Sequence, residues 1–147
     1  MSFQFKLERV MGLKEREKDE LTGEYNKSIE AFEKVGQKLY ELLKKKEDLA
    51  ILKGQQIQQG ISISQIQQTE RFIAALEQSI MHYQQLVAQA RAKMSEKEEE
   101  LIEKNIEVKK FEKMKEKQQI IYKETIEYEE KKLMDEISLQ QYMHRGN

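Results

Sequence analysis

The chain has 147 residues, enough for one ordinary globular domain, but charged residues make up 36% of it and aromatic residues only 7%. This composition is typical of long solvated helices rather than of a compact core. The 26 Lys and Arg residues balance 27 acidic residues, which excludes a general electrostatic attraction to nucleic acid or to an anionic membrane. The sequence has no cysteine, which excludes disulfides and thiolate chemistry.

The first residues of the chain do not resemble a targeting segment. Residues 1–6 lack the apolar region of a signal peptide, and no stretch approaches the roughly 20 apolar residues that span a bilayer. We therefore expect a cytoplasmic protein that does not insert into a membrane.

Along the first half of the chain, a set of mostly apolar residues recurs at alternating spacings of three and four residues. This repeat keeps one narrow stripe facing a partner helix, as in a coiled coil. Proline, which would interrupt a long helix, is absent from the sequence. We predict a first helix from about residue 3 to residue 58, whose stripe consists of Leu21, Tyr25, Ser28, Phe32, Val35, Leu39, Leu42, Lys46 and Leu49.

A turn is expected around Gly60, at about residues 59–63. Glycine ends helices readily because it adopts backbone conformations that other residues avoid. The serines that follow provide two alternative capping boxes for a new helix, Ser62 with Gln65 or Ser64 with Gln67. We expect the chain to reverse its direction here.

A second stripe with the same spacing follows the turn. Two helices joined by a short connection, each with one apolar stripe, pack antiparallel. The residue numbers of facing residues should add up to about 122, which places Phe32 opposite Ala90 and Val10 opposite Glu112. The predicted second helix spans about residues 64–143, and its stripe consists of Ile66, Thr69, Ile73, Leu76, Ile80, Tyr83, Val87, Ala90, Met94, Lys97, Leu101, Lys104, Val108 and Phe111.

The fold expected from these elements is all-α, a single long antiparallel two-helix coiled-coil hairpin over residues 1–147 with an overhanging C-terminal helix. The overhang runs from about Ile120 to Tyr142, beyond the reach of the first helix. Its apolar residues lie on more than one side of a helix. Either a partner covers this segment or it is a loosely helical tail.

The sequence offers little catalytic or ligand-binding chemistry. His82 and His144 are the two histidines and are too far apart to be helical neighbours, so we expect no metal site. Two paired helices form grooves rather than enclosed pockets, and we expect neither a cofactor nor enzymatic activity. The longest basic run, Lys44–Lys46, is followed at once by Glu47 and Asp48, and no nucleic-acid binding is expected.

The region after the turn is poor in charge. Between residues 54 and 90 the charged residues are Glu70, Arg71 and Glu77, and depletion of charge is typical of interface cores. Four residues here share one side of the second helix. In one interpretation Phe72 folds over the seam and seals the core, and in the other it anchors a partner protein. The four residues are Phe72, Leu76, Ser79 and Tyr83.

Three motifs resemble those of the flagellar export protein FliJ family. The first is Phe3-x-Phe5-x-Leu7-x-x-Val10-x-x-Leu13-Lys14-x-x-x-x-x-Glu20, the second is Gly60-Ile61-Ser62 followed by Phe72-Ile73-x-x-Leu76-Glu77-x-x-Ile80, and the third is Lys131-Lys132-Leu133-Met134-Asp135-Glu136. Together they extend over nearly the whole chain.

The resemblance implies a cytoplasmic component of the flagellar type III secretion apparatus, positioned peripherally at the cell membrane. Family members form an antiparallel coiled coil similar to the central stalk of rotary ATP synthases. They engage a hexameric export ATPase, the cytoplasmic domain of a membrane export gate, and export chaperones.

Carried over to this chain, the gate contact corresponds to Phe72, Leu76, Ser79 and Tyr83, although the family has Ala in place of Ser79 and His in place of Tyr83. The overhang is the end expected to enter the ATPase ring, through Ile121, Ile126, Leu133, Asp135, Glu136 and Ile137.

Two other functions remain open on the sequence, a structural tether that sets a distance and an escort for export substrates or their chaperones. A parallel dimer of extended helices is a further possibility for the assembly. We favour a monomer, because the turn residues near Gly60 would have no purpose in a continuous rod.

Overall fold

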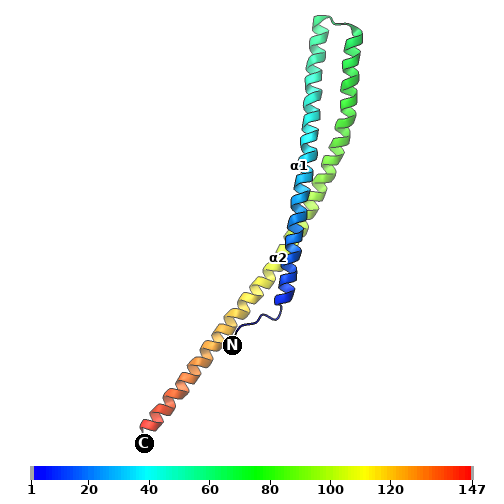
Figure 1. Ribbon diagram of the computed structural model, residues 1–147. Helices are drawn as coiled ribbons and strands as arrows, with labels where there is room; N and C mark the ends of the chain where they lie inside the picture. The colour runs from blue at the N-terminus through cyan, green and yellow to red at the C-terminus, as the bar shows by residue number, and fades with distance from the viewer. Residues whose placement is uncertain (1, 147) are drawn as a thin grey trace. The chain divides into compact units, whose positions relative to one another are not determined.

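The structure is a computed structural model that describes residues 2–146; Met1 and Asn147 lie outside the described residues. It contains two α-helices, α1 (Glu8–Gln59) and α2 (Ile63–Arg145), and no strand within the described range. Figure 1 shows the two helices joined by a short turn. They pack against each other, which confirms the predicted all-α hairpin.

The chain divides into two compact units. Unit 1 comprises Met1–Asp19 and Glu103–Asn147, and unit 2 comprises Glu20–Ile102. Each unit therefore contains part of α1 and part of α2. That the hairpin forms a single domain over residues 1–147 stays a prediction.

The seam of unit 2 follows the predicted stripes. Every stripe residue from Leu21 to Leu49 on α1, and from Ile66 to Leu101 on α2, is buried or half-buried. The most deeply buried are at most 8% exposed, namely Ser28, Leu42, Thr69 and Ile80. A narrow stripe on each helix thus forms the core of unit 2.

Pairs of side chains across this seam confirm the predicted register. Lys53 Nζ lies 3.1 Å from Glu70 Oε1, and Lys97 Nζ lies 3.0 Å from Glu24 Oε2. The residue numbers in each pair add up to within one of the expected value of about 122. Ala90 was expected to face Phe32. The guanidinium of the next residue, Arg91, lies 5.6 Å from the centroid of the Phe32 ring, which agrees with the expected position to within one residue.

The end of α1 has the hydrogen bonds of a Schellman motif. Gly60 has a φ of 70°, and its amide donates to the Ile57 carbonyl at 3.3 Å. The next amide, of Ile61, donates to the Gln56 carbonyl at 3.1 Å. A positive φ is costly for residues with a Cβ, so glycine at this position ends the helix.

The start of α2 resolves the choice between the two capping boxes. The Gln65 amide lies 3.4 Å from Ser62 Oγ and 3.1 Å from the Ser62 carbonyl oxygen, so Ser62 is the residue that caps the helix. Ser64 lies inside the first turn of α2, which begins at Ile63.

Unit 1 differs from the prediction at the amino terminus, because α1 begins at Glu8 and not near residue 3. Phe5 is buried, and the Phe3 ring lies 5.5 Å from the ring of Tyr122 on α2. An extended backbone advances about 3.3 Å per residue against about 1.5 Å in a helix. A non-helical segment therefore reaches further along α2 than helix would.

The core of unit 1 does not include Val10. Val10, expected opposite Glu112, is 40% exposed, whereas Met11 is 7% exposed and Val108 only 1%. Met11 continues the three- and four-residue spacing of the α1 stripe back from Leu21 through Lys18 and Lys14, so the same side of α1 is buried in unit 1.

Candidate partner-binding surfaces

The four residues predicted to contact a partner lie on α2 within unit 2. Phe72 is 57% exposed, and Ser79 is also exposed. Leu76 and Tyr83 are half-buried at the seam. The exposure of Phe72 favours the anchor interpretation over a ring folded down to seal the core.

The first groove on this side of unit 2 has a volume of about 420 Å³. Three of the four predicted residues line it together with Ala75, and α1 contributes Lys45 and Leu49. The lining residues are Lys45, Leu49, Phe72, Ala75, Leu76 and Ser79.

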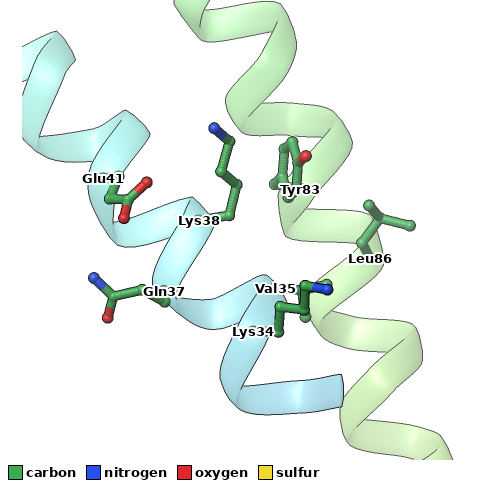
Figure 2. Close-up of a pocket in the computed structure, with 7 residues that line it drawn as sticks. All are labelled: Lys34, Val35, Gln37, Lys38, Glu41, Tyr83 and Leu86. Carbon is green, nitrogen blue, oxygen red and sulfur yellow. The ribbon is translucent and has the colours of Figure 1, made fainter. Parts of the chain in front are cut away.

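The second groove has a volume of about 490 Å³ and contains the fourth predicted residue, Tyr83. Figure 2 shows Lys38 lying between the two helices beside Tyr83. The structure thus divides the predicted set between two grooves. The second is lined by Lys34, Val35, Gln37, Lys38, Glu41, Tyr83 and Leu86.

Helical geometry places the two grooves one after the other along the same flank of unit 2. The spacings from Phe72 to Leu76, Ser79, Tyr83 and Leu86 keep these residues within about 40° of Phe72 around α2. The sequence placed Val35 and Leu49 in the predicted stripe, but no α1 residue was recognised as part of a partner surface. The three- and four-residue spacing was visible, but which side of α1 faces which side of α2 depends on the packing of both helices.

The residues predicted to enter a ring lie near the end of α2, in unit 1. From residue 123 to residue 146 every residue is exposed except Ile126, which is half-buried. The segment is helical through Arg145, in contrast to a loosely helical tail. The exposed members of the predicted set are Ile121, Leu133, Asp135, Glu136 and Ile137.

Six apolar residues near the end of α2 fall in two stripes, and all six except Ile126 are exposed. Ile126, Leu133 and Ile137 lie within about 40° of one another around the helix. Ile121, Tyr128 and Leu139 form a second stripe, turned by about 140° from the first. A single flat partner would cover one of these stripes and leave the other in water.

A cluster of charged side chains crosses the seam of unit 1. Lys104 Nζ lies 2.7 Å from Glu17 Oε2 and 3.0 Å from Glu107 Oε2, and Lys14 Nζ lies 3.5 Å from Glu107 Oε2. The hydrogen bonds from Lys104 lower the pKa of both carboxyls, and those carboxyls raise the pKa of Lys104. These shifts move all three groups away from neutral pH, which suits a structural ion pair and not a proton-transfer site.

Residues 2–146 contain no group of three or more His, Cys, Asp and Glu side chains placed to hold a metal ion. None of the helices in the described range is both long and apolar enough to cross a membrane. The expected absence of cofactors and of metal stays a prediction.

The fold and surfaces define a helical hairpin of the coiled-coil class, with apolar grooves on one flank of unit 2 and exposed apolar residues near the end of α2. A family model described as "Flagellar FliJ protein" matches residues 3–147. The Flagellar FliJ protein of Bacillus subtilis (strain 168) is 43% identical over 147 residues, which cover 100% of both chains. No solved structure shows a significant match to this chain.

The chain belongs to the flagellar FliJ family. It is accordingly a component of the flagellar export apparatus, and the family is not known for enzymatic activity.

Proposed function

We propose that this protein acts as a non-enzymatic central stalk that engages the hexameric export ATPase and couples it to the export gate. The observation that carries the proposal is the end of α2, a continuous helix whose apolar side chains are exposed on two sides. The proposal also places the protein in the cytoplasm, peripheral to the membrane at the export apparatus, and as a monomer.

The two stripes at the end of α2 support insertion into a ring. A pore surrounds what enters it and can therefore contact both Ile121 and Leu133, which lie on different sides of the helix. Apolar surface buried in this way contributes about 25 cal/mol per Å². Asp135 and Glu136, which form no ion pair within the described residues, supply negative charge that can pair with basic residues of the ring.

The grooves of unit 2 support the gate contact. An exposed aromatic anchor next to a shallow apolar groove is the kind of site that carries binding energy in interfaces between proteins. We propose that Phe72, Leu76, Ser79 and Tyr83 contact the cytoplasmic domain of the gate. The polar Ser79 and the phenol of Tyr83 would then lie within the contact.

Truncation after Glu127 tests the ring assignment. It removes Leu133, Asp135, Glu136 and Ile137 but leaves the seam of unit 2 intact, so we expect weaker binding to the ATPase ring and a smaller effect on its hydrolysis rate. Thermal unfolding followed by circular dichroism should show little change in the hairpin. Ring binding at wild-type strength would disprove this assignment of ends.

A pair of matched double variants makes the same test without a deletion. L133E/I137E places two charges in one stripe of the overhang, and L43E/I51E places two charges at exposed positions of α1 in unit 2. The first variant should lose ring binding and the second should retain it. Equal loss in both would point to a general effect of charge and count against ring insertion.

A pull-down followed by an ATPase assay distinguishes the stalk from two other functions, a chaperone escort and a structural tether. A chaperone escort, which can coexist with the stalk, predicts soluble complexes with small helical export chaperones in the absence of the ring. A structural tether predicts no effect on the ATPase at all. The stalk predicts both binding to the hexamer and a change in its hydrolysis rate.

A further inference from the structure

Three lysines of α1 form a row along the groove flank of unit 2. Lys34, Lys38 and Lys45 are exposed, and each lines one of the two grooves. Their spacings of four and seven residues keep them within about 40° of one another around α1. Glu41 is the one carboxylate among the groove-lining residues, so this row has an excess of positive charge.

These lysines form no ion pair with the part of the chain that the structure describes, Glu41 included, and the α2 residues across the grooves carry no carboxylate. The α2 side of the grooves consists of Phe72, Ala75, Leu76, Ser79, Tyr83 and Leu86.

The carboxylates of this part of α2 lie on its other flank. Glu70 and Glu77 are turned by about 150° from Phe72 around the helix. Glu70 Oε1 lies 3.1 Å from Lys53 Nζ, and Glu77 Oε1 lies 3.5 Å from Lys46 Nζ. Lys46 and Lys53 at the seam therefore have carboxylate partners, whereas the lysines of the groove flank pair with no carboxylate of residues 2–146.

An apolar row on one helix and a row of unpaired cations on the other define a surface with two distinct edges. Its length, from Phe72 to Leu86, is about 21 Å at 1.5 Å per residue, which corresponds to about four turns of helix. A groove between two helices accepts a third helix through apolar residues spaced three and four apart. The cationic edge selects a partner helix that carries carboxylates along its matching side.

We propose that the groove flank of unit 2 binds an acidic amphipathic helix of about four turns in the cytoplasmic domain of the export gate. Its apolar stripe contacts Phe72, Leu76 and Leu86, and its carboxylates pair with Lys34, Lys38 and Lys45. This inference rests on the gate contact of the proposed function and adds the chemistry of the bound segment.

The test measures the dissociation constant of the full chain for the purified cytoplasmic domain of the gate, at low and at high salt. The variant K34E/K38E/K45E reverses the cationic edge. The control K110E/K113E/K117E makes the same change in net charge at exposed positions of α2 in unit 1. A third variant, F72A, removes the aromatic anchor, and circular dichroism checks that all variants remain helical.

We expect the groove reversal to weaken binding about tenfold and to remove most of its salt dependence, since exposed pairs are individually modest but act together. The control should stay within about twofold of the wild type, because screened charges away from an interface contribute little. Phe72→Ala should also weaken binding, because it removes the aromatic contact area at one end of the groove flank.

The outcomes separate this inference from the proposed function. If Phe72→Ala weakens binding but the groove reversal does not, the gate contact stands and the acidic helix is disproved. If the control weakens binding as much as the groove reversal, the attraction is non-specific and the inference fails. If the wild type does not bind the gate domain at all, the gate contact itself is wrong and the inference falls with it.

Discussion

The two ends of α2 contain similar apolar residues in very different surroundings. Near the turn, Ile80 is 5% exposed because α1 packs along its side of the helix. Toward the carboxyl end, Ile121 is 60% exposed, and between residues 123 and 146 only Ile126 is half-buried. The spacing of apolar residues therefore determines that a helix has an apolar side. Whether that side is buried depends on how far a second helix extends along it.

Matched isoleucine substitutions give the largest contrast between these two regions. Ile80→Ala should lower the free energy of unfolding by about 2–5 kcal/mol, because it leaves a cavity in the seam. Ile121→Ala should change it by no more than about 0.5 kcal/mol, as is usual for exposed positions. Urea unfolding followed by circular dichroism measures both. Equal effects of the two variants would mean that the end of α2 is covered in the isolated protein.

Matched glycine substitutions test the turn that brings α1 alongside the first part of α2. Gly60→Ala should destabilise the hairpin by about 1–2 kcal/mol, because its φ of 70° is unfavourable for a residue with a Cβ. Gly54→Ala should stabilise it by up to about 1 kcal/mol, because Gly54 lies in α1 and a Cβ there meets no atom within 4 Å. Thermal unfolding compares the two variants. A neutral Gly60→Ala would show that the Schellman geometry contributes little.

The charged cluster of unit 1 should make a smaller, pH-dependent contribution. The pKa values of Glu17 and Glu107 are lowered from 4.5, so their contribution is present above pH 4.5 and is lost as the pH falls through their lower folded-state values. The raised pKa of Lys104 makes its contribution disappear only at strongly alkaline pH.

Acid titration of the wild type and of Lys104→Gln measures this contribution. In the wild type, the midpoint temperature of thermal unfolding should decrease as the pH is lowered below 4.5. The decrease should be smaller in the variant, because its carboxyls lack the cation. Lys123→Gln, at an exposed position of the overhang, is the control and should behave as the wild type. Identical acid profiles for all three proteins would show that water screens the cluster completely.

Part of the partner surface could be predicted from the sequence. The shared side of Phe72, Leu76, Ser79 and Tyr83 follows from helical spacing within one element, and depletion of charge indicated an interface. Their division between two grooves could not be predicted. It depends on which α1 side chains lie opposite, and Lys38 is beside Tyr83 only because of the packing of two helices.

The sequence by itself determined the two helices, the register of about 122 and the position of the turn, because periodic stripes and a short connection leave one antiparallel arrangement. Only the tertiary structure decided that Phe5 is buried in a non-helical segment, that Met11 is buried whereas Val10 is exposed, and that lysines with no ion pair among residues 2–146 border the grooves. The physical reason is that local spacing governs which side chains share a side of one helix. Contacts between distant segments decide which of those sides are buried and which charges find a partner.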